Sequence, residues 1–105
     1  MAEKATIARP YARAAFGFAS ERKALPQWSV LLGRAAAVVA DPRVAGFVGS
    51  PHVGSDQIVA LLADAAGDAA DEHGRNFLRA LAANRRLPLL PEIAARGWLE
   101  GLPAT

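Results

Sequence analysis

Apolar residues recur at helical spacing along most of the chain, and the first such stretch, residues 6–19, carries two apolar stripes instead of one. The first stripe consists of Ile7, Tyr11, Ala14 and Phe18, and the stripe beside it consists of Ala8, Ala12, Ala15 and Ala19. A helix on the outside of a small domain needs only one apolar face. This helix is therefore expected to be buried on two sides, either as a central core helix or with its second side against another protein.

The pattern predicts five further helices. They are expected at about 25–40, at 42–48, from Ser55 as the cap to about 66, from the acidic residues 68–72 to about 84, and from about 91 onward. The side chains expected to face inward are Trp28, Leu31, Leu32, Ala35, Val38 and Val39 in the second helix, Ile58, Val59, Leu61 and Leu62 in the fourth, Phe77, Leu78, Leu81 and Ala82 in the fifth, and Ile93, Ala94, Trp98 and Leu99 in the last.

Length and composition support a single all-α domain, a compact six-helix bundle over residues 1–105. Alanine, the best helix former, is the most frequent residue. The chain has no cysteine, which excludes disulfides, thiolate metal sites and a cysteine nucleophile. No basic segment followed by an apolar run marks a secretory signal, and no window approaches the roughly 18 apolar residues of a membrane span, so direct membrane insertion is not expected.

Arginines suggest one alternative function, a small helical nucleic-acid-binding module. Twelve basic and ten acidic residues leave a net charge of only +2. The arginines cluster at Arg75, Arg79, Arg85 and Arg86, with Arg9 and Arg13 on the first helix. Nucleic-acid binding usually needs a basic face undiluted by acids, and here an acidic cluster comes immediately before the arginines. Ion pairing or a solvated face is the better interpretation, so no nucleic-acid partner is predicted.

No credible active site or metal site emerges from the residues that could carry chemistry. His52 lies between Ser50 and Asp56, which would permit a hydrolase triad, but the glycine pattern of a nucleophile elbow is missing. His73 lacks a second histidine one turn away. The acidic cluster Asp64, Asp68, Asp71 and Glu72 does not have calcium-loop spacing. No catalytic residue, cofactor or metal is therefore predicted.

Two stretches at opposite ends of the chain carry a family resemblance. Residues 7–16 read IARPYARAAF, and residues 76–93 begin with Asn76-Phe77-Leu78 and continue as ANRRLPLLPEI from Ala83. Both resemble the signatures of the delta subunit of bacterial F-type ATP synthase, the counterpart of the mitochondrial oligomycin-sensitivity-conferring protein. The likeness covers about residues 4–96.

The resemblance implies a non-catalytic stator subunit of the peripheral stalk at the cytoplasmic face of the bacterial inner membrane. In that family a six-helix amino-terminal domain binds the amino-terminal helix of one alpha subunit and keeps the catalytic head stationary during rotary ATP synthesis. The groove for that helix lies between the first and fifth helices. The residues that it implies here are Ile7, Tyr11, Ala14, Phe18, Phe77, Ala80 and Asn84.

Two departures from the family limit what the resemblance implies. The family continues into a carboxy-terminal domain that contacts the b subunit of the stalk, and this chain stops before it. Contact with the b subunit is therefore expected only through that missing domain. Residues 97–105 do not continue the family pattern, so they are expected to be a frayed or non-native tail.

Overall fold

The computed structural model describes the backbone of residues 2–48 and 53–94, and the side chains from residue 6 onward in those ranges. Over these ranges the chain is all-helical, which confirms the predicted six-helix bundle. The helices are α1 (Ala2–Glu21), α2 (Leu25–Ala40), α3 (Pro42–Val48), α4 (Ser55–Ala66), α5 (Glu72–Ala83) and α6 (Leu90–Glu92), with short 3-10 turns η1 (Gly67–Ala69) and η2 (Leu87–Leu89).

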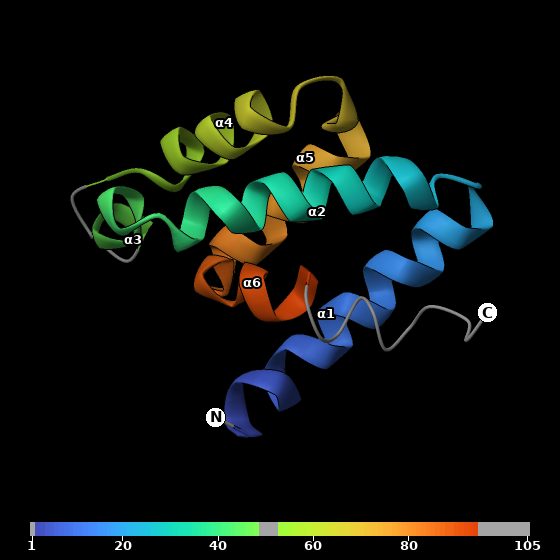
Figure 1. Cartoon of the computed structure of the whole chain (residues 1–105), viewed down its shortest axis with the longest axis horizontal. Helices are drawn as coiled ribbons and strands as arrows, with labels where there is room; N and C mark the ends of the chain where they lie inside the picture. Colours follow the sequence, from blue (N-terminus) through green and yellow to red (C-terminus); the bar gives the residue numbers. More distant parts are fainter. Residues whose placement is uncertain (1, 49–52, 95–105) are drawn as a thin grey trace.

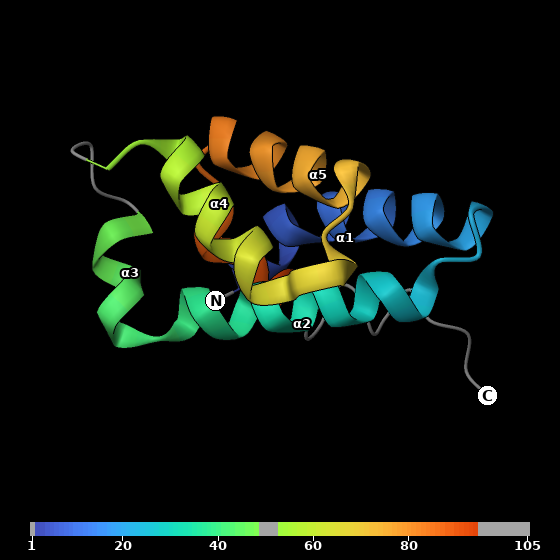
Figure 2. The same ribbon diagram turned by 90° about the horizontal axis from the view of Figure 1, so that it is seen from above.

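The central element is α2 and not α1. It runs along the long axis of the molecule, with α4 on one side and α6 on the other (Figure 1), and α3 turns across its end (Figure 2). Its buried side chains are Trp28, Leu31, Leu32, Ala35, Ala36 and Val39. α1 lies on the outside and packs against α2 and α6, so the interpretation of α1 as a core helix surrounded by the others was wrong.

Local sequence signals set both ends of α2. Pro26 occupies its first turn, where the missing N–H costs nothing. Asp41 leaves the helical conformation at the other end, and its carboxylate accepts hydrogen bonds from the Arg43 backbone N–H at 2.8 Å and from the Arg43 side chain. These bonds to Arg43 lower the pKa of Asp41 to about 2. The same Asp-Pro pair therefore ends α2 and starts α3, as predicted.

Two polar side chains of α2 fix the turn between α4 and α5. The Gln27 side chain donates to the Ala69 carbonyl at 3.1 Å, and Arg34 donates to the Ala66 carbonyl at 3.3 Å. Both carbonyls belong to residues at a helix end, where the backbone has no intrahelical partner. Gly67 follows with a φ of 63°, the left-handed conformation that glycine adopts without strain, and ends α4 where predicted.

Gly74 allows a close approach between the first turn of α5 and the middle of α2. A Cβ at this position would lie 2.8 Å from Cδ2 of the fully buried Leu31. Any side chain here would push α5 away from α2 or displace Leu31.

Three predicted details of the helices were wrong. α1 begins at Ala2 and not at Thr6, whereas α6 begins at Leu90, within one residue of the predicted start. Gly54 is the N-cap of α4 in place of Ser55, and its N–H donates to Gln57 at 3.3 Å. Leu61 is 45% exposed because the face that α4 turns toward the bundle is formed by Ile58, Val59, Leu62, Ala63 and Ala66.

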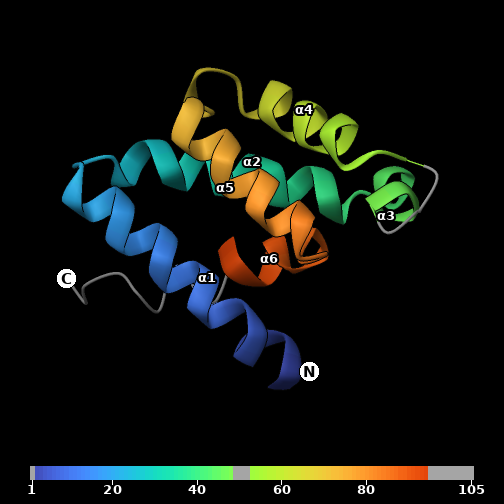
Figure 3. The ribbon, with the colours of Figure 1, turned by 180° about the vertical axis from the view of Figure 1, so that it is seen from behind.

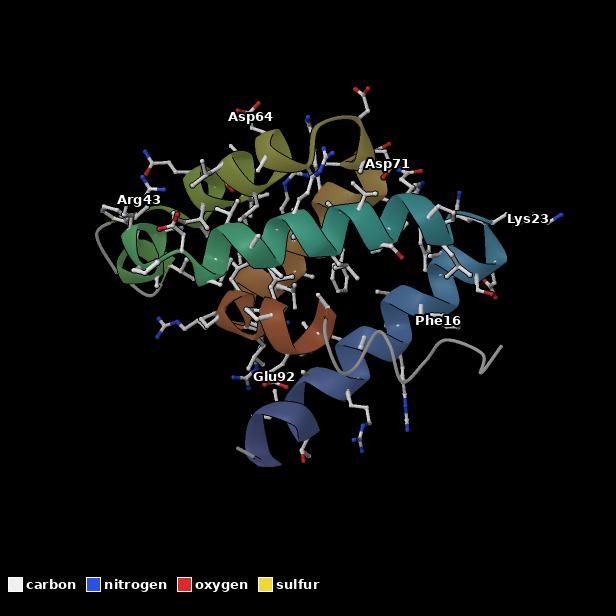
Figure 4. The ribbon with its side chains drawn as sticks, in the orientation of Figure 1. Phe16, Lys23, Arg43, Asp64, Asp71 and Glu92 are labelled. Atoms are coloured by element: carbon white, nitrogen blue, oxygen red, sulfur yellow. The ribbon has the colours of Figure 1, made fainter. Side chains whose placement is uncertain are left out.

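Asp71 caps α5, as the acidic start of that helix predicted. It lies where the chain turns from α4 into α5 (Figure 4), and its carboxylate accepts a hydrogen bond from the Gly74 N–H at 2.8 Å. That bond is the main reason why the pKa of Asp71 is lowered, with smaller contributions from Gln27 and His73.

We expect Asp71→Ala to lower the free energy of unfolding at pH 7 by about 1 kcal/mol, the usual cost of losing a cap. Because the folded-state pKa is depressed, the charge of Asp71 stabilises the fold above the unfolded-state pKa, and this contribution is lost as pH falls through the folded-state pKa. Urea unfolding at pH 7 and pH 3 measures both effects. Asp71→Asn keeps a capping oxygen, so its free energy of unfolding at pH 7 should fall less than that of Asp71→Ala. Because this variant carries no titrating carboxylate at the cap, lowering the pH to 3 should remove no further stability through this position. Equal losses of unfolding free energy in both variants at both pH values would contradict the assignment.

Candidate partner-helix groove

The two apolar stripes of α1 differ in burial. The alanine stripe is fully buried, with Ala8, Ala12, Ala15 and Ala19 each at most 1% exposed. The stripe of larger side chains remains accessible: Ile7 is 38% exposed, Ala14 is exposed, and Tyr11 and Phe18 are half-buried. The bundle therefore packs against the alanines, which let α1 come close, and covers the larger stripe only in part.

α5 presents a matching face on the same side of the molecule. Seen from behind, α1 and α5 run obliquely and antiparallel across one face (Figure 3). α1 packs against α2 and α6, whereas α5 packs against α4 and η2, so their backbones do not pack closely on each other. Phe77 is half-buried, and Ala80 and Asn84 are exposed, at the spacing of one helix face.

An aromatic cluster links the two helices at one end of this face. The Trp28 ring, 3% exposed on α2, lies 5.5 Å from the Phe18 ring of α1 and 5.4 Å from the Phe77 ring of α5. Such distances are typical of stabilising aromatic pairs. Phe18 and Phe77 each cover part of their ring surface against Trp28. The part of the face that is more accessible to a partner is therefore expected near Tyr11, Ala14, Ala80 and Asn84.

Two residues that sequence reasoning missed belong to the same end. The His73 ring lies 5.1 Å from the Phe18 ring, and Cζ of Arg22 lies 4.6 Å from the centre of that ring. A sequence signal existed for both. His73 is one turn before Phe77 and Arg22 is one turn after Phe18, so each extends a predicted stripe. The surface formed by Ile7, Tyr11, Ala14, Phe18, Arg22, His73, Phe77, Ala80 and Asn84 is called the α1–α5 face below.

Two cavities of the described part of the chain lie away from the α1–α5 face. One, of about 400 Å³, lies between α4 and α5 and is lined by Asp56, Val59, Ala60, Ala63, Asp64, Arg75 and Arg79. The other, of about 580 Å³, is lined by Val48, Val53, Gly54, Ser55, Ile58, Ala82, Ala83, Arg85, Leu87 and Pro88. None of the predicted groove residues lines either cavity. A face formed by two helices that borders neither of these cavities suits an extended partner better than a small molecule.

The other sequence candidates fall partly inside and partly outside the described residues. His52, Trp98 and Leu99 lie outside the described residues. Over residues 2–48 and 53–94 no group of three histidine or acidic side chains could hold a metal ion. Arg75 and Arg79 share their cavity with Asp56 and Asp64, so the arginine cluster of α5 does not form an undiluted basic surface.

Comparison with known proteins identifies the family of the chain. The sequence model for the ATP synthase delta (OSCP) subunit matches residues 7–96, a span that contains the whole α1–α5 face. The chain belongs to this family. Among curated ATP synthase delta subunits, that of Alcanivorax borkumensis is 50% identical over 93 residues, which cover 89% of this chain and 52% of that protein.

Other delta subunits give the same result. The Alkalilimnicola ehrlichii protein is 47% identical over 96 residues, covering 90% of this chain and 54% of its own length. The Stenotrophomonas maltophilia protein is 47% identical over 107 residues, covering 99% of this chain and 57% of its own, so that similarity extends past residue 96. The chain spans about half the length of these relatives. In the part that the structure describes, no helix is both long and apolar enough to cross a bilayer.

Proposed function

We propose that this chain is the amino-terminal domain of a stator subunit of F-type ATP synthase, and that it binds the amino-terminal helix of an alpha subunit on its α1–α5 face. The observation that carries the proposal is the incomplete burial of the larger α1 stripe, with Ile7 38% exposed beside an alanine stripe that is at most 1% exposed. Family membership supports a partner within the ATP synthase, because the matched proteins are delta subunits of that complex.

The proposed task is mechanical and needs no catalytic group. During ATP synthesis the rotor exerts torque on the catalytic head, and the head must be anchored if that torque is to do work at the nucleotide sites. A domain that grips an alpha subunit and is itself joined to the peripheral stalk provides the anchor. Attachment to the b subunit belongs to the carboxy-terminal half of the family, so it is not assigned to the described helices.

The form of the α1–α5 face supports a helix as the occupant. Ala14 and Ala80 are small and exposed, which lets a guest backbone approach, while Tyr11 and Phe77 supply partly exposed aromatic surface. A helix laid in an apolar groove commonly contacts its host through residues at i, i+3, i+4 and i+7. Burial of about 800 Å² on each partner in a well-packed interface supports binding as tight as nanomolar, about −12 kcal/mol.

Location follows from the same proposal. The domain is placed on the catalytic head, at the cytoplasmic face of the inner membrane, as a peripheral component held by protein contacts. Residues 97–105 lie outside the described residues, and a frayed or non-native tail there stays a prediction.

A titration with a synthetic peptide of the cognate alpha subunit's amino-terminal helix tests the proposal. Trp28 is buried between Phe18 and Phe77, and the variant Trp98→Phe leaves it as the single tryptophan reporter. We expect saturable binding, seen as a change in Trp28 emission and as heat in calorimetry on the unaltered chain. A scrambled peptide of the same composition is the control. Equal response to both peptides, or no response at micromolar concentrations, would reject the proposal.

A further inference from the structure

We infer that Arg22 forms an ion pair with a carboxylate of the bound helix and thereby fixes the direction in which that helix lies on the α1–α5 face. The inference rests on the proposed function and adds a chemical requirement for the partner. The bound helix must carry an aspartate or glutamate near the end that covers Phe18.

Arg22 is held in place by the ring of a groove residue. It follows the last residue of α1, and its guanidinium carbon lies 4.6 Å from the centre of the Phe18 ring, one helical turn earlier. A guanidinium stacked on an aromatic face keeps its N–H donors free at its edge and loses little side-chain freedom on binding. The contact therefore holds the guanidinium beside Phe18, at one end of the α1–α5 face.

No acid within the described part of the domain is ion-paired with Arg22. Asp41, at the far end of α2, is ion-paired with Arg43 at 2.8 Å. Asp71, the acid that starts α5, already accepts the Gly74 N–H. Glu21 precedes Arg22 in the chain and is exposed, and Lys23 follows it with a second positive charge (Figure 4).

Charge is distributed unevenly along the face. At the Phe18 end lies the positive charge of Arg22, against the Phe18 ring. The residues of the face at the opposite end, Ile7 and Asn84, are uncharged, and Arg85, next to Asn84, lines the cavity beside α4. A bound helix with an acidic residue near one end can place it beside Arg22 in only one of its two directions. The uneven charge along the α1–α5 face therefore favours one orientation of the helix.

Desolvation makes a carboxylate the fitting partner. A helix that covers Phe18 removes water from the side of the guanidinium that faces the groove. A charge that loses water without gaining a partner weakens binding, whereas a charge-assisted fork to a carboxylate compensates for the loss. The planar fork matches the two oxygens of a carboxylate, which lysine cannot do.

The test pairs one substitution in the domain with one change in the peptide. We expect Arg22→Gln to weaken binding of the cognate alpha-subunit peptide about three- to tenfold in calorimetry at low salt, the range expected for a partly desolvated ion pair. Arg13→Gln, the same charge change on an exposed arginine of α1 outside the α1–α5 face, should change affinity less than twofold. With a peptide whose acidic residues are all replaced by their amides, the unaltered chain and Arg22→Gln should bind equally.

The outcomes separate this inference from the proposed function. If the unaltered chain does not bind the peptide, the proposed function fails. If it binds but Arg22→Gln has no effect, or if the effect of Arg22→Gln persists with the amide peptide, the groove stands and the ion pair is overturned. A cognate helix without any aspartate or glutamate would overturn it as well.

Discussion

Ala14→Asp is expected to weaken binding of the alpha-subunit helix at least about a hundredfold, because a bound helix would bury the new carboxylate in an apolar contact without a partner. In the free domain Ala14 is exposed, so the carboxylate remains in water and the bundle should fold. The only expected cost to folding is the lower helix propensity of aspartate, about 0.6 kcal/mol. Calorimetry with the peptide measures the first effect, and thermal unfolding measures the second.

Ala37→Asp is the matched control for that substitution. Ala37 is exposed on α2, among residues that face away from the bundle, so the change in charge and helix propensity is the same. It should leave peptide affinity unchanged. Equal loss of affinity in both variants would mean that charge or stability, and not the groove, controls binding; unchanged affinity in Ala14→Asp would remove Ala14 from the groove.

Leu31→Ala is expected to have the largest effect on stability, lowering the free energy of unfolding by about 3–5 kcal/mol. Leu31 is fully buried on the central helix and packs against the first turn of α5 at Gly74. Its truncation therefore leaves an apolar cavity closed off from water. This loss is a large share of the about 5–15 kcal/mol that stabilises a typical domain. Urea unfolding followed by circular dichroism measures it.

Ile7→Ala provides the contrast between a core residue and a groove residue. Ile7 is 38% exposed, so its truncation should cost under about 1 kcal/mol of stability while weakening peptide binding. A stability loss for Ile7→Ala as large as that for Leu31→Ala would show that Ile7 serves the fold and not a partner.

The elements with strong local signals were predictable from sequence. The bounds of α2 and α3 were predicted to the residue, because Pro26 and the Asp41-Pro42 pair specify helix ends through backbone geometry alone. Gly67 and Asp71 likewise act within one turn of the chain. Leu61 was predicted to face inward because α4 carries apolar residues on several of its sides. Which of these sides is buried depends on the helices packed against α4 and not on the α4 sequence alone.

The α1–α5 face was predictable in part. Periodicity revealed two stripes on α1, but the size of side chains would favour burying the larger one, and the bundle buries the alanines. Which stripe faces inward depends on how closely α2 and α6 approach α1, and that distance is not encoded in α1 itself. His73 was missed because it joins the site through the Phe18 ring, a contact between segments far apart in the chain. Arg22 lies only one turn after Phe18, but the spacing alone does not show that its guanidinium lies over the ring.

The most direct test of the proposed groove is a heteronuclear NMR titration of the ¹⁵N-labelled chain with the alpha-subunit helix peptide. The account predicts that the largest amide shifts fall on Tyr11, Ala14, Ala80 and Asn84, on the two helices that border the α1–α5 face. Amides of Ala60 and Ala63, in the cavity between α4 and α5, should move little. Large shifts confined to that cavity, with Tyr11 and Ala14 unmoved, would contradict the account.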